Sequence, residues 1–479
     1  MAEEQRGTLV GRTLDNLAAA WRDIAVGAAR TVGLSVVEGA PHDEKAMRGL
    51  MQACLEARGG EVSARMRAAE LGETYLELDE AGRLQFLEIL ARDFAVDVEA
   101  VKGRARAYLE SEPGAEQLKA EDELRRALAP PRVRLLTQFN VLPQGVKFLA
   151  DLRADLLRLA NADPYLGGLE RDLRELLESW FDVGFLDLRR ITWDSPASLL
   201  EKLIDYEAVH EITSWEDLRK RLDSDRRLYA LFHPRMPDEP LAFVEVALVK
   251  GMAANVQTLL KADTPAADPK SFDTAIFYSI SNTQRGLRGI SFGDYLIKRV
   301  VQQLASELPQ IKTFATLSPI PGFRPWLKAC TWDEIASLVT EDEQGGIRAL
   351  GGLDQPHEAL LAVLEQPDWP DDPVTREALK GALMRLCVRY FLTTRDDGRP
   401  IDSVARFHLR NGARLERINW LGDTSKNGLE RSAGLMVNYR YVVGDIEKNH
   451  EAYMQRGEIT MGSEVRALAK SVRSRWLAA

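Results

Sequence analysis

Residues 274–317 decide the fold of the second half of this chain. They read TAIFYSIS at 274–281, NTQRGLRGISFG at 282–293, an amphipathic segment from about Phe292 to Leu308, and IKTFATL at 311–317. The first and last runs are apolar and rich in β-branched and aromatic residues, which predicts two strands. The segment between them has apolar residues at helical spacing. The stretch therefore predicts a strand, a glycine-containing loop, a helix and a second strand.

The loop of this unit has features of an anion site. Its glycines let backbone N–H groups approach an anion, and the following helix adds a partial positive charge at its N-terminus. Arg285 and Arg288 supply charged donors, whereas Asp294, in the first helical turn, would repel a phosphate placed too near. The glycine spacing differs from that of the Rossmann and P-loop motifs. The alternative is a plain strand-to-helix turn with a solvated arginine pair.

The segments around this unit predict an α+β protein with two domains. Residues 1–187 carry apolar stripes at helical spacing, which predicts an all-helical bundle whose stripes form its core or, alternatively, a surface for a partner helix. From residue 188 to residue 479, helical segments alternate with β-rich runs. The further strands predicted there are 228–232 and 241–248, joined by a turn at 233–240, and then 404–409 and 435–443.

The composition excludes several classes of function. The chain has 479 residues and a net charge of −10, with no block of basic residues, which argues against nucleic-acid binding. Cys54, Cys330 and Cys387 lie far apart and form neither a disulfide framework nor a zinc site. No uncharged apolar run approaches the ~18 residues of a membrane span, and the first residues lack a signal-peptide pattern. We therefore expect a soluble cytoplasmic protein without a membrane or nucleic-acid partner.

The order of strand, loop, helix and strand is similar to that of the GNAT acetyltransferase core, where a Q/R-x-x-G-x-G/A loop holds the pyrophosphate of coenzyme A. Aligned on Gly289, this chain has Gly286 at the first glycine-loop position and Ser291 at the last, so the match is partial. The residues expected to bind coenzyme A are Gln284, Arg285, Gly286, Leu287, Arg288, Gly289, Ile290, Ser291, Phe292, Gly293 and Asp294. The resemblance implies a GNAT-like α/β catalytic domain at 188–479, after the helical domain at 1–187.

Longer blocks of the chain resemble the malonyl-CoA decarboxylase family. They include Ala275–Ser281, Thr283-Gln284, Gly286-Leu287, Gly289, Leu296–Val301, Leu317–Phe323, Phe407–Leu409, Asn411–Ala413, Arg417–Trp420, Gly434–Met436 and Asn438–Tyr441. The resemblance extends over about residues 188–443, whereas the N-terminal part is similar mainly in length and helical character. It implies conversion of malonyl-CoA to acetyl-CoA and carbon dioxide by a homo-oligomer, a tetramer or dimer of dimers, with subunit contacts from the helical domain.

The resemblance also implies the site residues. Ser318 and His408 are expected to be the catalytic pair, and Tyr441 is expected to belong to the same site. Family knowledge makes the serine a proton acceptor. A serine hydroxyl is a weak base when nothing ionises it, so we expect Ser318 to orient the substrate by hydrogen bonding and His408 to donate the proton.

This chemistry needs no separate cofactor. Loss of carbon dioxide from a malonyl thioester leaves a carbanion that delocalises onto the thioester oxygen as an enolate, so the thioester is its own electron sink. We therefore expect no metal and no cofactor, coenzyme A being part of the substrate. The protein must orient the acyl group, stabilise the enolate and deliver a proton.

One residue departs from the family pattern. Many members have a glutamate where this chain has Ser291, so another group must take its role, and Asp294 is a candidate. Two other functions stay open. One is a GNAT-type N-acyltransferase, against which the retained Ser318 and His408 argue. The other is a non-catalytic acyl-CoA-binding assembly protein, which would tolerate loss of His408.

Overall fold

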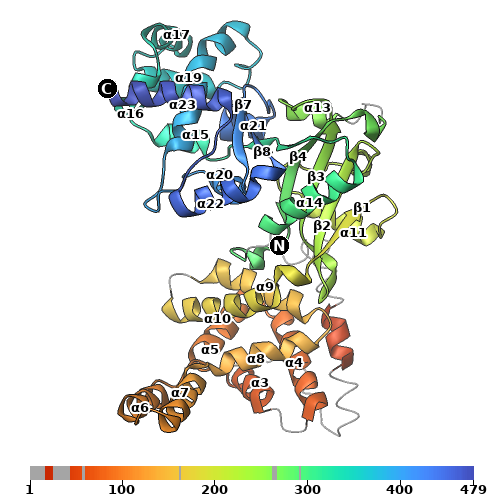
Figure 1. The fold of residues 1–479 in the computed structure, drawn as a ribbon. Coiled ribbons are helices and arrows are strands. Elements are labelled where there is room, and N and C mark those ends of the chain that lie inside the picture. Colours follow the sequence, from red (N-terminus) through yellow and green to blue (C-terminus); the bar gives the residue numbers. More distant parts are fainter. Residues whose placement is uncertain are drawn as a thin grey trace. The chain divides into compact units, whose positions relative to one another are not determined.

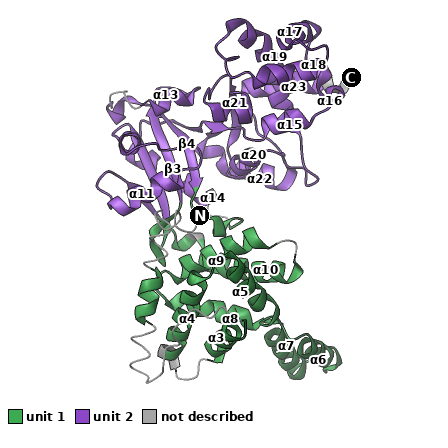
Figure 2. Cartoon of the chain, turned by 180° about the vertical axis from the view of Figure 1, so that it is seen from behind, with its two compact units in different colours: residues 1–187, 232–241, 282–292 green, residues 188–231, 242–281, 293–479 purple. Residues whose placement is uncertain are grey.

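The computed structural model describes residues 17–24, 44–56, 60–160, 163–261, 267–290 and 293–478. Their contacts divide the chain into two compact units (Figure 2). The first unit comprises residues 1–187, 232–241 and 282–292, and the second comprises 188–231, 242–281 and 293–479. The glycine loop therefore groups with the helical unit, although the strand before it and the helix after it group with the second unit.

The first unit is helical. Its elements are α3 (Glu44–Glu56), α4 (Gly60–Glu77), α5 (Glu80–Arg92), α6 (Val98–Glu110), α7 (Ala115–Leu128), α8 (Pro131–Thr137), η1 (Gln138–Val141), α9 (Gly145–Leu159), α10 (Pro164–Trp180) and η2 (Val183–Phe185). Aspartates begin three of the helices, since the side chains of Asp79, Asp97 and Asp163 accept backbone N–H groups at the N-caps of α5, α6 and α10. The predicted helical character of this region is confirmed.

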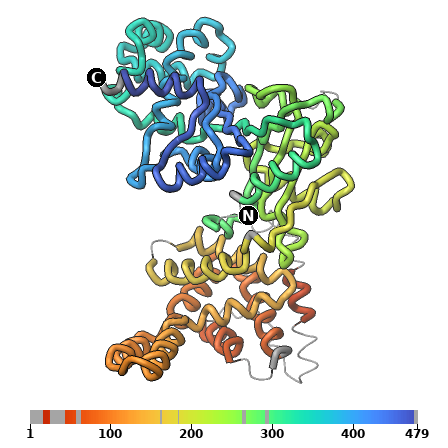
Figure 3. The backbone as a smooth tube through the Cα atoms, in the orientation of Figure 1, coloured from red at the N-terminus to blue at the C-terminus, as the bar shows by residue number. Residues whose placement is uncertain are grey.

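Aromatic residues and leucines form the core of the helical unit. Trp21 is fully buried, packs edge-on against Phe148 with ring centroids 4.9 Å apart, and donates from Nε1 to the Pro143 carbonyl at 3.0 Å. Leu149, Leu152 and Leu156 of α9 are also buried, so that stripe belongs to the core. The helices α6 and α7 pack against each other (Figure 3). By contrast with α9, neither of them buries any of its own residues.

The second unit is built on a mixed sheet (Figure 1). Its strands are β1 (Asp187–Ile191), β2 (Arg226–His233), β3 (Met236–Val249), β4 (Thr274–Asn282), β5 (Thr313–Thr316), β6 (Ser318–Pro319), β7 (Arg414–Asn419) and β8 (Met436–Tyr441). The strand order is β1-β2-β3-β4-β5-β8-β6, with β7 also paired to β8. The strands β4 and β5 run parallel, and the helix α14 (Gly293–Glu307) connects them, whereas β8 is antiparallel to β5, β6 and β7.

The rest of the second unit is mainly helical. Its further helices are α11 (Ala197–Tyr206), α12 (Trp215–Arg221), α13 (Val256–Leu260), α15 (Phe323–Ala329), α16 (Trp332–Ile335), α17 (Glu341–Gly351), α18 (Pro356–Glu365), α19 (Pro373–Leu392), α20 (Ser403–Arg410), α21 (Lys426–Ser432), α22 (Ile446–Arg456) and α23 (Ser463–Ala478). The short 3₁₀ turns of this unit are η3 (Pro269–Ser271), η5 (Ala336–Leu338) and η6 (Val443–Asp445), whereas η4 (Arg285–Leu287) belongs to the first unit. A helical unit followed by a mixed sheet with helices confirms the predicted α+β class.

The strands β5 and β6 both pair with β8 in the same register, as one continuous strand would. Phe314 pairs with Tyr441 and Ser318 with Val437, so the register does not shift between them. Successive side chains of a strand point to opposite faces of a sheet. Thr316, Ser318, Tyr439 and Tyr441 consequently share one face, and the apolar cluster that includes Ala315, Leu317 and Met436 occupies the other face.

Most predicted strands in this region are confirmed, with one change in a turn. The runs at 274–281, 311–317 and 435–443 correspond to β4, β5 and β8, and β6 follows directly after the second of these runs. The hairpin predicted around 233–240 is real, but its turn is only Pro234 and Arg235, and β3 already begins at Met236. Pro237 and Pro240 are part of β3 because the fixed φ of proline is compatible with an extended backbone.

The strand predicted at 404–409 is wrong, because this segment is the helix α20 (Ser403–Arg410). Asp402 begins the helix by accepting the Ala405 N–H at 2.6 Å. Ala405, His408 and Leu409 are buried at positions i, i+3 and i+4, the spacing of one helical face. His408 is therefore carried by a helix, and the strand that follows is β7, which the sequence did not predict.

Candidate active site

The predicted residues Ser318, His408 and Tyr441 meet on one face of the sheet. The His408 Nε2 atom lies 3.2 Å from the Ser318 Oγ atom, and its Nδ1 atom lies 2.8 Å from the Tyr441 hydroxyl. All three side chains are buried, with exposures of 6% for Ser318 and 2% for the other two residues. The sheet supplies the two hydroxyl groups, and α20 supplies the imidazole between them.

Packing and a capped helix fix the imidazole. The His408 ring stacks on the Tyr439 ring, with centroids 4.5 Å apart and an interplanar angle of 25°. Asp402, the N-cap of α20, also accepts the Tyr390 hydroxyl at 3.0 Å. Ring orientation and helix position are thereby set before any substrate arrives, which is the condition for a preorganised site.

Burial keeps His408 neutral. Its removal from water lowers the pKa of the imidazole from 6.5 to about 3. A neutral imidazole carries one N–H, so one ring nitrogen donates and the other accepts. Both nitrogens face hydroxyl groups, and a hydroxyl can donate or accept a hydrogen bond. These two contacts are therefore compatible with either tautomer of His408.

Two residues that the sequence did not single out complete this network. The Ser318 hydroxyl donates to the Thr316 Oγ1 atom at 2.9 Å, and the Tyr439 backbone N–H donates to the same oxygen at 3.1 Å. Thr316 is fully buried. The available signal was the alternation in Thr316-Leu317-Ser318, which places Thr316 and Ser318 on the same face of a strand.

A polar layer holds β8 in register from the opposite face. Asn438 donates through Nδ2 to the carbonyls of Thr316 at 2.7 Å and Ala253 at 3.1 Å. Arg417 donates through Nε to the Asn438 side-chain oxygen at 3.2 Å, and Asn419 donates to that oxygen at 2.9 Å. Arg417, Asn419 and Asn438 belong to the blocks of family resemblance, and these contacts give them a structural role beside the candidate site.

The glycine loop is held within the first unit. Arg153 is buried, pairs with Glu170, and donates through Nη1 to the carbonyls of Gly286 at 2.6 Å and Arg288 at 2.9 Å. A Cβ atom at Gly286 would lie 1.6 Å from the Ala150 carbonyl oxygen, so only glycine fits there. The loop backbone is therefore fixed at Gly286 and Arg288.

The side chains of the predicted coenzyme A residues divide into two groups. Arg285, Arg288 and Gly289 are exposed, and Gly289 has a φ of +89°. Gln284, Gly286, Leu287 and Ile290 are buried, and Gln284 donates through Nε2 to the Pro240 carbonyl at 3.1 Å. Ser291 and Phe292 lie outside the described residues, as does the side chain of Asp294, while Gly293 begins α14.

A carboxylate that the sequence did not single out also contacts β4. Glu207 accepts the hydroxyls of Ser279 at 2.6 Å and Ser281 at 3.0 Å, together with the backbone N–H groups of Val209 and His210. Ser279 and Ser281 lie on the same face of β4 as Phe277, whose ring centroid is 6.3 Å from that of Tyr441. Glu207 therefore fixes two hydroxyls on the face that carries the candidate site.

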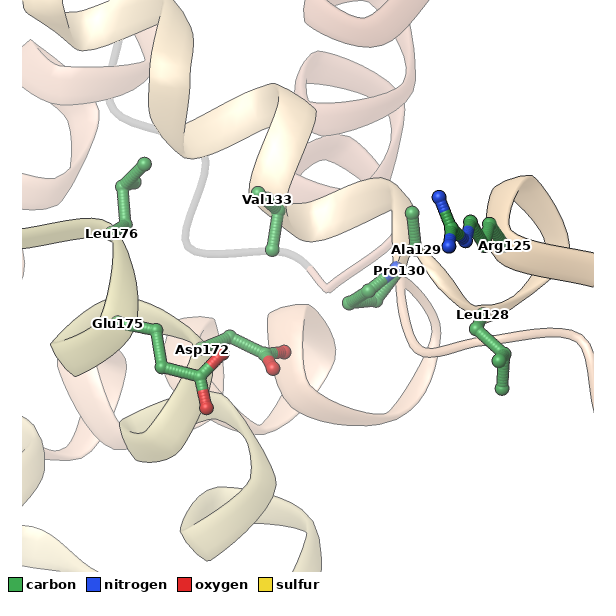
Figure 4. A pocket seen from close by; sticks show the side chains of 8 residues that line it. All are labelled: Arg125, Leu128, Ala129, Pro130, Val133, Asp172, Glu175 and Leu176. Atoms are coloured by element: carbon green, nitrogen blue, oxygen red, sulfur yellow. The ribbon is translucent and has the colours of Figure 1, made fainter. Parts of the chain in front are cut away.

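The helical unit carries a pocket of about 340 Å³ (Figure 4). Its lining comes from the end of α7, from α8 and from α10, and comprises Arg125, Leu128, Ala129, Pro130, Val133, Asp172, Glu175 and Leu176. Asp172 is engaged by Arg132 at 2.6 Å. The pocket thus offers no imidazole, thiol or hydroxyl nucleophile for chemistry.

Among the residues that the structure describes, no three His, Cys, Asp or Glu side chains gather in a way that could hold a metal ion. None of the helices described there has the length and apolar character needed to cross a membrane.

Family models match most of the chain. The model of the malonyl-CoA decarboxylase C-terminal domain matches residues 184–478, and the model of the N-terminal domain of the same family matches residues 94–181. The candidate site residues and the glycine loop all fall within the first of these matches.

Individual relatives and solved structures agree with these matches. The mitochondrial malonyl-CoA decarboxylases of Anser anser anser and Rattus norvegicus are 39% and 37% identical, over 84% and 82% of this chain and 83% of each relative. Crystal structures of malonyl-CoA decarboxylases from Rhodopseudomonas palustris and Agrobacterium vitis have TM-scores of 0.79 and 0.78 and identities of 42% and 41%. They cover 89% and 88% of this chain and 99% of each of those chains. The chain belongs to the malonyl-CoA decarboxylase family.

Proposed function

We propose that Ser318, His408 and Tyr441 carry out the decarboxylation of malonyl-CoA to acetyl-CoA and carbon dioxide, the carboxy-lyase reaction for which the family is named. The observation that supports these roles is the buried hydrogen-bonded array in which His408 lies between the two hydroxyls. The array contains a proton donor, an orienting hydroxyl and a second proton source, which are the groups that this reaction requires.

The bond between the carboxylate and the α-carbon breaks first in this scheme. Its electron pair moves onto the α-carbon and the thioester oxygen, and carbon dioxide leaves. The enzyme promotes this step by holding the carboxylate out of the plane of the thioester carbonyl, so that the breaking bond aligns with the carbonyl π system. Ser318 orients the acyl group through a hydrogen bond, and a base is not required to start the reaction.

Protonation of the α-carbon completes the reaction. His408 donates the proton from Nε2, and the Tyr441 hydroxyl donates to Nδ1 as the Nε2 proton leaves. A histidine with a pKa of about 3 is neutral at neutral pH, so its N–H group is the donor and no imidazolium is needed. A solvent proton then returns to Nε2 and the Nδ1 proton returns to Tyr441, which restores the starting tautomer and closes the cycle.

The glycine loop is proposed to bind the pyrophosphate of coenzyme A in a GNAT-like catalytic domain. Two observations support the proposal. The parallel pair β4 and β5 is connected through the loop and α14, and the exposed side chains of Arg285 and Arg288 flank a backbone fixed by Arg153. Replacing both loop arginines with alanine should raise KM for malonyl-CoA more than it lowers kcat, because the phosphates take no part in the chemical step.

We further propose that the protein forms a homo-oligomer, that it is cytoplasmic and that it needs no cofactor. Leu109, Leu118 and Leu128 of α6 and α7 are exposed by 80%, 66% and 52%, which is consistent with a subunit contact through the helical domain. The thioester chemistry supports the absence of a cofactor, since the electron sink is supplied by the substrate.

Acetyl-CoA formation from malonyl-CoA, without added metal or cofactor, tests the proposal. The wild-type protein should convert malonyl-CoA completely, and His408→Ala and Ser318→Ala should each lower kcat by about 10²- to 10⁴-fold. His357→Ala is a matched control, because His357 lies on α18 and its Nε2 atom contacts the Leu327 carbonyl at 2.9 Å. Unchanged turnover in His408→Ala would remove His408 from the mechanism, and consumption of malonyl-CoA only with an added amine would indicate acyl transfer instead.

A further inference from the structure

Thr316 decides which ring nitrogen of His408 can carry the proton. Its Oγ1 atom accepts two hydrogen bonds, from the Tyr439 backbone N–H at 3.1 Å and from the Ser318 hydroxyl at 2.9 Å. The side chain is fully buried, so no bulk water competes for these donors. The Ser318 proton is therefore committed to Thr316 until the acyl group of the substrate accepts it, and in both cases it points away from His408.

This commitment determines the direction of every other bond in the network. A serine hydroxyl has one proton, so Ser318 can meet the His408 Nε2 atom, 3.2 Å away, only as an acceptor. Nε2 must then carry the single N–H of the neutral ring. Nδ1 is left as an acceptor, and the Tyr441 hydroxyl at 2.8 Å must be its donor. The donors run in one order, from Tyr441 through His408 and Ser318 to Thr316.

We propose that Thr316 is a positioning residue that holds His408 in the Nε2–H tautomer, the form able to donate a proton to the α-carbon. The inference rests on the proposed roles of His408 and Ser318. Thr316 itself touches neither substrate nor reacting atoms in this scheme. It acts through Ser318, by removing the Ser318 proton from the line between Ser318 and His408.

The local structure suits Thr316 to this task. Threonine is β-branched, so its χ1 angle is restricted on a strand, and its oxygen is additionally anchored by the Tyr439 N–H. The Asn438 side chain holds the Thr316 carbonyl at 2.7 Å from the other face of the sheet. Both the backbone and the hydroxyl of Thr316 are thus fixed by β8, the strand that also carries Tyr441.

Loss of the threonine hydroxyl would reverse the order of donors. In Thr316→Val, a near-isosteric change, the Ser318 proton has Nε2 of His408 as its nearest acceptor. The ring would then take the Nδ1–H tautomer and donate to Tyr441, leaving Nε2 without a proton for the substrate. The wrong tautomer of a catalytic histidine is strongly deleterious even when its position is preserved.

Kinetics and tautomer can be measured on the same set of full-length variants. Thr316→Val should lower kcat by about 10²-fold, with KM for malonyl-CoA within about twofold, because substrate binding is unaffected. Thr316→Ser keeps the acceptor and should stay close to wild type. Thr313→Val is the matched control, since the same change is made on the same strand but on its opposite face.

Nitrogen NMR of protein labelled in its six histidines reads the tautomer directly, with His408→Gln to assign the resonance. Wild type and Thr316→Ser should show His408 protonated at Nε2, and Thr316→Val should show it protonated at Nδ1.

A wild-type enzyme protonated at Nδ1, or Thr316→Val with wild-type kcat, would overturn the proposal. The wild-type spectrum decides the matter even if Thr316→Val does not fold. An Nε2–H ring in a protein that leaves malonyl-CoA intact would refute the proposed function and still support the role of Thr316.

Discussion

The two faces of the sheet in the second unit bury polar groups in different ways. One face carries the network of Tyr441, His408, Ser318 and Thr316, in which each group is neutral. The other carries a charged cluster: the Arg221 guanidinium contacts Glu245 at 3.0 Å and Asp217 at 3.0 Å, and also donates to the carbonyls of His210 and Glu211. Glu245 is completely buried, and Arg221 is 4% exposed.

Burial shifts a pKa on both faces, so a shifted pKa alone does not mark the site. Burial, followed by repulsion from Glu207, raises the pKa of Glu245 from 4.5 to about 8 in spite of Arg221. Burial lowers the pKa of His408 to about 3. The difference lies in the partners. Every donor of Arg221 ends on a carboxylate or a carbonyl, whereas the hydroxyls and the imidazole can each give one proton and accept another.

The largest effect expected from this comparison is on stability. Arg221→Met removes the donor of a buried cluster and should lower the free energy of unfolding by about 3–5 kcal/mol, measured by urea denaturation. The specific activity of the fraction that remains folded should change little. Adding Glu245→Leu should recover much of the loss, because it removes the carboxyl group left without its partner. An Arg221→Met protein of wild-type stability would show that the cluster contributes nothing net to folding.

The two faces should also give opposite dependences of stability on pH. Between pH 6.5 and 3 the unfolded chain binds a proton at His408 that the folded protein excludes, so stability falls as pH falls, by about 1 kcal/mol per pH unit. Between pH 4.5 and 8 the folded protein holds a proton on Glu245 that the unfolded chain has lost, so stability falls as pH rises, by about the same slope.

Two variants separate these slopes. His408→Gln should lose only the acid-side contribution, and Glu245→Gln only the contribution on the alkaline side, as followed by thermal unfolding across this range. If both variants kept the wild-type profile, neither group would differ in proton binding between the folded and unfolded states.

A smaller effect is expected at the far end of the hydroxyl network. Tyr441→Phe keeps the ring and removes the donor to Nδ1 of His408, a hydrogen bond worth ~1 kcal/mol, so kcat should fall by about fivefold. Tyr453→Phe on α22 (Ile446–Arg456) is a suitable control, since it is the same change in a buried tyrosine outside the network. A wild-type kcat in Tyr441→Phe would remove Tyr441 from the proposed proton transfer.

The sequence predicted most of the hydroxyl and imidazole network on one face of the sheet, and it predicted nothing of the Arg221 cluster on the other face. Ser318, His408 and Tyr441 came from blocks of family resemblance. The strand that carries Tyr441 came from its apolar, β-branched pattern, whereas the strand predicted at 311–317 ended one residue before Ser318. Thr316 escaped notice because threonine in such a run is an ordinary strand residue. Its role depends on a contact with Ser318 and on the Tyr439 N–H, neither of which a one-dimensional pattern contains.

The error at α20 has a similar cause. The run Val404-Ala-Arg-Phe-His-Leu409 is short and partly apolar, and such a run fits a strand or a helix equally well by periodicity. The helix is decided by Asp402, whose carboxylate caps the Ala405 N–H and accepts the Tyr390 hydroxyl. Tyr390 lies on α19, so the second of these contacts is tertiary and could not be seen from local sequence.

The smallest effect is expected for an ion pair at the surface. Its contribution to the free energy of unfolding is the reference for the contribution of the buried Arg221 cluster. Arg174 and Glu178 on α10 are four residues apart, 3.6 Å from each other and both 44% exposed. Arg174→Met should lower the free energy of unfolding by no more than ~0.5 kcal/mol, because solvent screens the pair in the folded and unfolded chain alike. Since Arg221→Met makes the same substitution, the difference between the two variants isolates what burial adds to a charge. A comparable loss at both positions would mean that the side-chain stem, and not the buried charge, carries the stability of the Arg221 cluster.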